Sequence, residues 1–329
     1  MKKNITISDV AEQVGVSKAT ISRYLNGNYG KMSKETKKRI EEVIAELDYR
    51  PNKQAQALKS KKSYLIGVIV ADISNMYSSL LLKGIGEVLG EAGYQMIIMD
   101  AANSIEQEQD LLNKLLDQQV EGIILQASSW NGAKYQFLQK TGIPVLLVDR
   151  EIEPLLFPLV TADNSDSTKQ LSQLILEKNY DCVTVISEPL SDIITREVRY
   201  QSVREVILAA EKEVKLIELT KKMSLRDELK KIAASPQKEA IFASNGRVLM
   251  DCLTILIEEE IKIPEHIGVV GFDDWQMSAL VGPGITSIEQ QTKIIGEKSA
   301  KRILSLLENN EVKIEIDIIK SKITNRGSL

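Results

Sequence analysis

The stretch TISDVAEQVGVSKATISRYLNG, residues 6–27, decides the fold of the front of this chain. It predicts two short helices joined by a tight turn. Thr6 to Asp9 match the S/T-x-x-D/E pattern of a helix start, and Gly15 can take the left-handed conformation that ends a helix. Ser17 can cap the second helix, whose outer face then carries polar and basic side chains. This arrangement is typical of a helix-turn-helix unit, whose second helix lies in the major groove of DNA.

A third helix is predicted to begin after Ser33, over KETKKRIEEVIAEL. Its apolar positions recur at helical spacing, so they form one buried stripe. The stripe consists of Ile40, Val43, Ile44 and Leu47. Three such helices can bury a shared core that the first two could not provide alone. A three-helix bundle with no role in DNA binding is the alternative.

The outward side chains of the second helix have the chemistry needed to read bases. Lys18 or Arg23 can donate to guanine O6 and N7, and Ala19 can contact a thymine methyl group. Hydroxyl and amide side chains can bind phosphates, which fixes the register of the protein on DNA but specifies no sequence. The candidates for phosphate contacts are Thr6, Ser17, Ser22 and Asn26.

Residues 51–62 are interpreted as a hinge helix and linker behind a helix-turn-helix domain of residues 1–50. Pro51 stops the third helix, and the segment after it is too short and too polar to be a stable helix alone. Paired copies with an apolar wedge would suit insertion into the minor groove. The candidates for this contact are Asn52, Ala55, Leu58 and Lys59. A plain linker with one exposed leucine is the alternative.

Charge is distributed unevenly along the chain. Residues 1–62 hold 14 basic and 7 acidic residues, whereas the remainder holds 28 basic and 39 acidic residues. A basic head on an acidic body indicates a DNA-binding module attached to a part that should not bind DNA. A solvated, lysine-rich surface is the alternative explanation.

Several classes of protein do not fit the sequence. The two cysteines, Cys182 and Cys252, lie far apart and suggest neither a disulfide framework nor a zinc site. The N-terminus does not have the pattern of a signal peptide, and no apolar run is long enough to span a membrane. We therefore expect a cytoplasmic protein without a membrane segment. No motif indicates catalytic residues, a metal site or a cofactor, so we expect none of the three.

From residue 64 onward, short apolar runs alternate with amphipathic stretches, which is typical of parallel strands covered by helices on both faces. The runs are residues 66–70, 94–100, 122–126, 144–149, 159–163, 182–187, 214–219, 240–244 and 267–273. The sequence therefore predicts an all-α head and an α/β body of two doubly wound parallel-sheet lobes. We place residues 63–161 plus 291–329 in the N-terminal lobe and residues 162–290 in the C-terminal lobe.

One glycine pattern within this body is deceptive. Gly84, Gly86 and Gly90 resemble a dinucleotide-binding loop, but they lie well inside a predicted helix instead of at the turn after a strand. We expect close helix packing there.

A chain of motifs, in order, resembles the lactose-repressor (LacI/GalR) family of bacterial transcription factors. The motifs are DVAEQVGVSKATISRYLNG, ELDYRPNKQAQALKSKKSYLIGVIVADISN, VEGIIL, PVLLVDR and IPEHIGVVGFDD. The resemblance covers essentially the whole chain. It implies a homodimer whose two heads read a near-palindromic operator in double-stranded DNA. It also implies lobes of the periplasmic-binding-protein type that close on a small sugar or sugar-acid effector.

By position, the resemblance carries base reading to Lys18, Ala19 and Arg23, and minor-groove insertion to Leu58. It carries effector binding to Arg199, Asn245, Asp273 and Gln290. Departures from the family pattern at Met76, Ser202 and Gly246 lie near the expected pocket, so the effector of a well-known member cannot simply be transferred.

In doubly wound sheets, ligands bind beyond the carboxyl ends of the strands. This rule and the resemblance together give the predicted effector-binding residues: Asp72, Asn75, Trp130, Asp149, Arg150, Arg196, Arg199, Asn245, Asp273, Trp275 and Gln290. Each has a structural alternative. Asp149 and Asp273 can simply cap loops, Trp275 can belong to the core or a dimer interface, and the arginines can pair with Glu197, Glu205 or nearby acids.

Arginines are the most specific clue to the effector. Arg150, Arg196, Arg199 and Arg247 all follow predicted strands, and guanidinium groups bind carboxylate or phosphate in a fork geometry. We therefore hypothesise an anionic effector, a sugar acid or sugar phosphate. Members of the family that control sugar-acid breakdown, of the 2-keto-3-deoxygluconate type, share the Thr195-Arg196 pattern.

The sequence thus predicts a repressor of a carbohydrate-catabolism operon that is controlled by a small effector. A catabolite-control-type regulator with a protein co-effector is one alternative, and a solute-binding protein is another. Nothing in the sequence favours an enzyme.

Overall fold

The computed structural model describes residues 5–30, 32–50, 62–191, 193–273, 277–308 and 313–329. The chain divides into two units, Met1–Ser63 and Tyr64–Leu329. No described helix has both the length and the apolar character that crossing a membrane requires.

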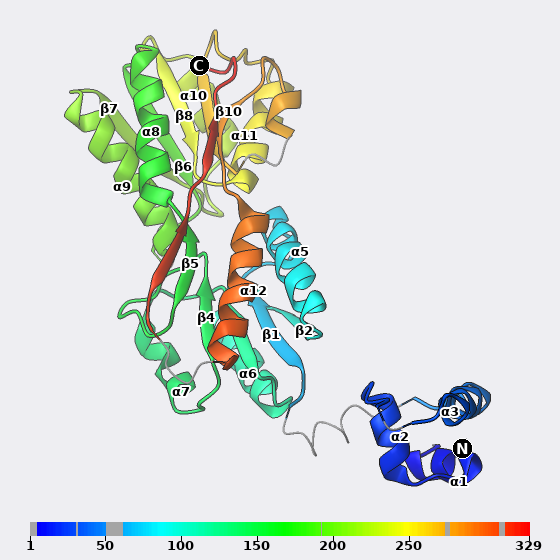
Figure 1. Ribbon diagram of the computed structural model, residues 1–329. Helices are drawn as coiled ribbons and strands as arrows, with labels where there is room; N and C mark the ends of the chain where they lie inside the picture. Colours follow the sequence, from blue (N-terminus) through cyan, green and yellow to red (C-terminus); the bar gives the residue numbers. More distant parts are fainter. Residues whose placement is uncertain (1–4, 31, 51–61, 192, 274–276, 309–312) are drawn as a thin grey trace. The chain divides into compact units, whose positions relative to one another are not determined.

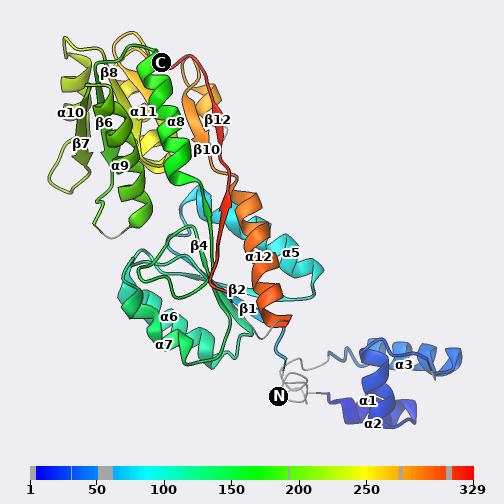
Figure 2. The same cartoon turned by 60° about the vertical axis from the view of Figure 1, so that its left-hand side comes forward.

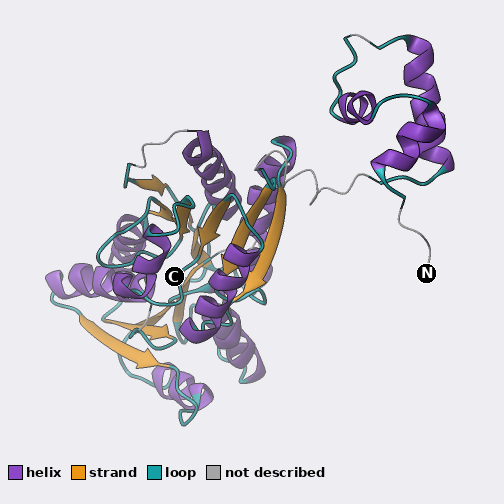
Figure 3. Ribbon diagram, turned by 90° about the horizontal axis from the view of Figure 1, so that it is seen from below, coloured by secondary structure: helices purple, strands orange, loops and turns teal. Residues whose placement is uncertain are grey.

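Three helices make up the described part of the first unit: α1 (Ile7–Val14), α2 (Lys18–Leu25) and α3 (Lys34–Glu46). Figure 3 shows them as a bundle of helices and loops. The predicted capping box is confirmed, because the Thr6 hydroxyl accepts a bond from the Asp9 amide and the Asp9 carboxylate accepts one from the Thr6 amide. Gly15 ends α1 with φ of 78°, a left-handed value that glycine adopts without strain.

A small apolar core joins these three helices. It contains Val10, Val14, Ile21, Ile40 and Val43, all buried, as well as Tyr49 after α3. Ile44 and Leu47 are half-buried against this core, so the predicted stripe on the third helix is confirmed.

The second unit holds two six-stranded sheets, which Figure 1 shows one above the other. The first sheet has, in spatial order, β11 (Ile316–Ile319), β5 (Leu159–Ala162), β4 (Val145–Val148), β3 (Gly122–Leu125), β1 (Leu65–Val70) and β2 (Gln95–Asp100). All of its strand pairs are parallel. The apolar runs therefore became strands as predicted, and the central strands are almost fully buried.

The second sheet repeats this plan. It has, in spatial order, β12 (Lys322–Thr324), β10 (Thr286–Glu289), β9 (Gly268–Phe272), β8 (Glu239–Ala243), β6 (Cys182–Ser187) and β7 (Glu213–Glu218). Its pairs are parallel except that of β12 with β10, which is antiparallel. The edge strands β2 and β7 are only partly buried, since an edge strand has a neighbour on one side only.

Helices cover both faces of each sheet. On the first sheet, α5 (Met76–Glu91) and α12 (Thr292–Glu308) pack on one face, whereas α6 (Ile105–Asp117), the 3₁₀ turn Gly132–Tyr135 and α7 (Gln136–Gln139) pack on the other. On the second sheet, α8 (Asn164–Glu177) and α9 (Ile194–Ala209) oppose α10 (Leu225–Ala233) and α11 (Gly246–Glu258). A further 3₁₀ turn covers Met277–Leu280.

Three segments of the described chain connect the two sheets: β5 to α8, β10 to α12, and β11 to β12. The last of these runs from one lobe to the other in Figure 2. The placement of all of residues 291–329 in the N-terminal lobe is therefore wrong at its end. The open edge of β10 accepts β12 as an antiparallel neighbour, and the Ser328 hydroxyl donates to the Val269 carbonyl at 2.6 Å.

Close packing of α5 on α12 explains the deceptive glycine pattern. A Cβ built on Gly84 would lie 2.1 Å from the Lys293 carbonyl oxygen, and one on Gly296 would lie 2.3 Å from the Leu81 carbonyl oxygen. Each of these two helices therefore has a glycine where the backbone of the other approaches. The expected packing role is confirmed for Gly84, whereas Gly90 has open space around it.

Replacing Gly84 with alanine should lower the free energy of unfolding by about 1–3 kcal/mol, because the two helices must move apart. The matched control is Gly90→Ala in the same helix, where no atom lies within 4 Å of the added Cβ. That variant should be unchanged or up to about 1 kcal/mol more stable, since alanine favours helix. Urea unfolding at one protein concentration measures both, and equal stabilities would contradict the close-approach argument.

Candidate functional site

The outer face of α2 carries the predicted base-reading residues. Lys18, Ala19 and Arg23 are exposed, as is Ser22, whereas Ile21 on the opposite face is fully buried. This distribution leaves the long basic side chains available to a partner. It follows directly from the helical spacing of the apolar positions.

Of the predicted phosphate contacts, Thr6, Ser17 and Asn26 lie at helix ends, and Ser22 lies within α2. Thr6 and Ser17 use their hydroxyls as N-caps of α1 and α2, and Asn26 is the C-cap of α2. A phosphate at either of the two N-caps would meet backbone amides of a helix N-terminus, which attract anions. The predicted hinge residues Asn52, Ala55, Leu58 and Lys59 lie outside the described residues, so their role stays a prediction.

Most of the predicted effector residues gather between the two lobes, in an inner and an outer layer. We call Asp149, Arg199, Asp273 and Gln290, together with Tyr77, the inner layer. All five side chains are buried. Sequence analysis missed Tyr77, because an aromatic residue in the first turn of an amphipathic helix has the pattern of ordinary core.

Arg199 is the centre of the inner layer. Its Nε donates to Asn164 Oδ1 at 2.9 Å, its Nη1 donates to the Ser244 carbonyl at 2.8 Å, and its guanidinium lies over the Phe272 ring at 3.6 Å. Burial lowers the pKa of Arg199, whereas the nearby charges of Asp273 and Asp149 oppose that shift. The guanidinium thus lies close to a carboxylate of each lobe.

Asp149 and Asp273 occupy equivalent positions in the two lobes. Each follows the fourth strand of its lobe, β4 or β9, with a left-handed φ of 66° or 71°. Each accepts a bond from a glutamine: Gln126 Nε2 donates to Asp149 at 2.7 Å, and Gln290 Nε2 donates to Asp273 at 2.5 Å. Burial raises the pKa of the Asp273 carboxyl, although Arg199 and Gln290 lower it in part.

Some buried polar atoms at the strand ends have no hydrogen-bond partner among the described residues. They include Gln290 Oε1 and Ser244 Oγ. Burial, followed by the charges of Asp149 and Asp273, raises the pKa of Tyr77, so this phenol stays protonated. Because leaving such groups unpaired is costly, this edge of the sheets suits a ligand rich in hydroxyls or carboxyls.

The outer layer surrounds a cavity of 480 Å³, a size typical of small-molecule sites. Its lining comes from both lobes and includes Asn103, Ser128, Glu188, Arg196, Arg247 and Asp251. Arg196 Nη2 donates to Glu188 at 2.5 Å, and Asn245 Nδ2 donates to the same carboxylate at 3.0 Å. Asn245 also caps α11 through its side-chain oxygen.

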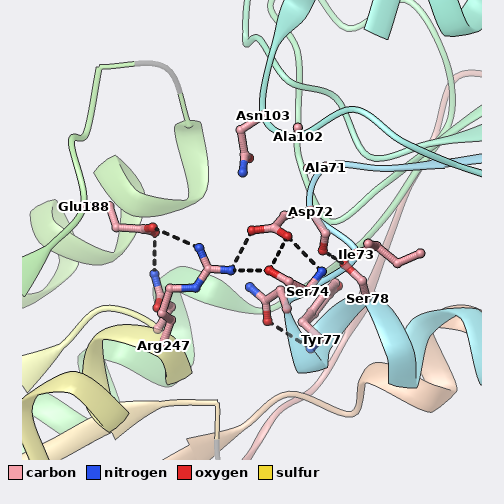
Figure 4. A network of polar contacts seen from close by, with 12 residues as sticks. Ala71, Asp72, Ile73, Ser74, Tyr77, Ser78, Ala102, Asn103, Glu188 and Arg247 are labelled. Carbon is pink, nitrogen blue, oxygen red and sulfur yellow. Dashed lines mark hydrogen bonds and ion pairs between the residues drawn. The ribbon is translucent and has the colours of Figure 1, made fainter. Parts of the chain in front are cut away.

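Arg247 connects the two lobes. Its Nη2 donates to Asp72 Oδ2 at 2.6 Å and to Ser74 Oγ at 3.1 Å, as Figure 4 shows. Burial would raise the pKa of the Asp72 carboxyl, but hydrogen bonds from Ser74 and Arg247 hold it below its ordinary value. The sequence indicated Arg247 as one of four arginines but gave no sign of this pairing.

Arg150 lies on the first-lobe side of the cleft. Its guanidinium donates to the Ala127 carbonyl at 3.2 Å and to Asn103 Oδ1 at 3.1 Å, so it holds a side chain that lines the cavity. The neighbouring loop is fixed by buried Glu108, whose carboxylate accepts from the Ser128 amide and the Tyr135 hydroxyl, each at 2.7 Å.

Two other predicted effector-binding residues, Trp130 and Asn75, are not among the described residues that line the cavity. Trp130 is 46% exposed, and its stacking role stays a prediction. Asn75 caps α5 by accepting from the Tyr77 amide at 3.0 Å. Trp275 lies outside the described residues.

Ion pairing with nearby acids, the structural alternative for the arginines, is found for Arg196, although the partner is Glu188 and not Glu197 or Glu205. Glu197 accepts a bond from Gln201, and Glu205 pairs with Lys169. The acids that pair with cleft arginines lie beyond the strand ends: Glu188 pairs with Arg196, Asp72 with Arg247, and Asp149 with Arg150 at 4.0 Å.

Comparison with known proteins agrees with both units. Residues 6–52 match the family described as bacterial regulatory proteins, lacI family, and residues 184–329 match the periplasmic binding protein-like domain. The chain is 38% identical to the HTH-type transcriptional regulator KdgR of Bacillus subtilis over 330 residues, which covers 98% of this chain and 97% of that protein. It belongs to the LacI family.

Other relatives lead to the same family. The HTH-type transcriptional regulator PtxS of Pseudomonas putida is 33% identical over 99% of this chain and 96% of its own length. In fold, a lac repressor dimer bound to operator and an anti-inducer matches with a TM-score of 0.86 at 22% identity, over 99% of each chain. The LacI-family chain is therefore a DNA-binding transcriptional regulator, and the predicted head and α/β lobes are confirmed.

Replacing Arg199 with methionine should lower the free energy of unfolding by about 3–5 kcal/mol, because Asp149 and Asp273 would stay buried without the Arg199 charge, and only Asp149 keeps another cation, Arg150 at 4.0 Å. The double variant Arg199→Met/Asp273→Asn should recover part of that loss, since one of the two uncompensated charges is removed. Urea unfolding of both variants tests this. A double variant less stable than the single one would show that the charges are not coupled.

Proposed function

We propose that this regulator represses a carbohydrate-catabolism operon by binding a near-palindromic operator as a homodimer. The exposed side chains of Lys18, Ala19 and Arg23 on α2 support sequence reading by that helix. Residues 51–62 would serve as the hinge between the DNA-binding domain and the lobes. Because its target is chromosomal DNA, we place its action in the cytoplasm.

Its effector, in this proposal, is an anionic sugar of the sugar-acid or sugar-phosphate class that binds between the lobes. The observation that carries this proposal is that Arg196 and Arg247 line one cavity whose lining comes from both lobes, while Arg150 holds Asn103 of the same lining. Gln290 Oε1 and Ser244 Oγ, which have no hydrogen-bond partner among the described residues, would bind hydroxyl groups of such a sugar. The relation to KdgR and the Thr195-Arg196 pattern favour a sugar acid of the 2-keto-3-deoxygluconate type.

Control would operate through the relative position of the lobes. A ligand that contacts both lobes stabilises one arrangement of them, and this arrangement sets the spacing of the paired hinge segments in the dimer. A coupling free energy of about 1–3 kcal/mol would change operator affinity roughly 5- to 150-fold. We propose release of DNA by the effector, which suits a regulator of a breakdown pathway.

A protein co-effector is the alternative, because the chain is also 28% identical to the catabolite control protein A of Staphylococcus aureus. The higher identity to KdgR and the cleft arginines favour a metabolite. A pull-down with phosphocarrier protein distinguishes the two. A solute-binding role is not supported, since residues 6–52 match the DNA-binding family.

Arg23→Ala should weaken operator binding and relax base preference at one position of each half-site, with about 1–3 kcal/mol of discrimination lost. Gel shifts at two salt concentrations would test this on the near-palindrome upstream of the gene and on single-base variants. Lys38→Ala on α3, where the side chain is 79% exposed and pairs with Glu42, is the control and should change little. An equal loss of affinity for operator and for random DNA would contradict base reading and show that Arg23 contacts phosphate instead.

Calorimetric titration should show that the protein binds 2-keto-3-deoxygluconate or a hexose phosphate more tightly than a neutral hexose. Arg196→Gln should weaken anion binding about tenfold or more, because the fork donor is lost. Arg226→Gln is the matched control, since Arg226 pairs with Glu258 and Glu259 away from the cavity. Binding of the neutral sugar alone would refute the anionic effector.

A further inference from the structure

Arg247 differs from the other cleft arginines in the origin of its partner. Arg196 pairs with Glu188 of its own lobe, so that pair persists when the lobes move. Arg247 on α11 pairs instead with Asp72, which follows β1 in the opposite lobe. Its only other described ion pair is to Glu188, at 3.9 Å, so Asp72 is the close acceptor. The Arg247 pairing therefore depends on how the lobes stand to each other.

The Asp72 side chain presents oxygen atoms to Arg247 in the way a sugar acid would. Asp72 Oδ2 and Ser74 Oγ both accept from Nη2, at 2.6 Å and 3.1 Å. The other carboxylate oxygen accepts from the Ser74 amide at 2.9 Å and from its hydroxyl at 2.6 Å, which holds the carboxylate in place. A carboxylate with an adjacent hydroxyl is the same set of acceptors that one end of a sugar acid carries (Figure 4).

We propose that Asp72 and the acid group of the effector compete for the Arg247 guanidinium, so that Asp72 sets effector affinity and selectivity as a competitor instead of a ligand. This inference rests on the proposed anionic effector. It identifies Arg247 as a residue of the cavity wall that, together with Arg196, recognises the acid group.

The competition is possible because the pair is only partly buried. The side chains of Arg247 and Asp72 are 41% and 21% exposed, and Arg247 lines the cavity. An ion pair in such surroundings is screened by solvent and stabilises only weakly, so an incoming carboxylate can replace it. A neutral sugar cannot supply the charge that Asp72 gives to Arg247, and the internal pair therefore disfavours neutral ligands.

Replacement of Asp72 by the effector at Arg247 would also change how the two lobes are held together. When the effector takes the place of Asp72, the direct tie from α11 to the turn after β1 is lost and the bound acid group stands between them. One substitution at residue 72 is thus expected to change both affinity for the anion and preference against neutral sugars.

Calorimetry with 2-keto-3-deoxygluconate and with a neutral hexose tests the inference on the full-length protein. Asp72→Asn should tighten binding of the acid about three- to tenfold, because Arg247 loses the negative charge of its internal partner and keeps only a weaker neutral acceptor. Arg247→Gln should weaken binding of the acid at least about tenfold, whereas binding of the neutral hexose should not weaken. In the Arg247→Gln background, Asp72→Asn should bring no further gain, which is the signature of two coupled residues.

Asp251→Asn is the control for the general loss of negative charge. Asp251 lines the same cavity, and the described hydrogen bonds and ion pairs of Arg247 do not include it. A gain from Asp72→Asn that exceeds the gain from Asp251→Asn supports competition. Equal gains, or weaker binding by Asp72→Asn, overturn it. The wild type reports separately on the proposed function: if it binds the acid while the Asp72 variant fails the test, only the competition is wrong, and if it binds no acid, both proposals fail.

Discussion

A buried guanidinium among carboxylates is the interaction on which the effector-binding body depends. Arg199 is fixed by Asn164, by the Ser244 carbonyl and by the Phe272 ring, and it lies close to Asp273 and Asp149. Such a group is stable in the interior only with opposite charge beside it. Because one of those carboxylates belongs to each lobe, the charge balance of the inner layer requires both lobes.

Parallel topology explains why these charges meet. In each sheet the carboxyl ends of the central strands lie at one edge, and the turns that follow carry polar side chains. Three segments of the described chain connect the two lobes, and these edges of the two sheets face each other. Asp149 follows β4 and Asp273 follows β9, and both residues have a left-handed φ. The second lobe thus repeats the first, and the ligand cleft forms between two similar ends.

The inner and outer layers of the cleft differ in how firmly they are held. The inner side chains are buried and mostly hydrogen-bonded, so they keep one arrangement. The outer arginines and acids are partly exposed, and their pairs can exchange partners at small cost. A fixed inner layer and an outer layer whose ion pairs can exchange partners suit a site that binds a small molecule. Binding at such a site can also change the conformation of another part of the chain.

Local patterns predicted the elements well where one feature dominates. The capping box at Thr6, the left-handed Gly15 and the continuous apolar runs each fix a helix start, a helix end or a strand by short-range sterics and burial. The strand β12 was not predicted, and neither was the place of Tyr77 in the inner layer of the cleft. A three-residue strand such as β12 forms because β10 offers an open edge, and Tyr77 has the same helical spacing as core residues.

The sequence by itself determined the class of this protein: a basic three-helix head, two α/β lobes and a set of arginines after the strands. Tertiary structure decided which acids those arginines pair with. Asp72 and Arg247 are far apart in the chain, and only the contact of the two lobes brings Arg247 Nη2 within 2.6 Å of Asp72 Oδ2. Periodicity and capping act over a few residues, whereas the partner of a charged side chain depends on how whole sheets are placed in space.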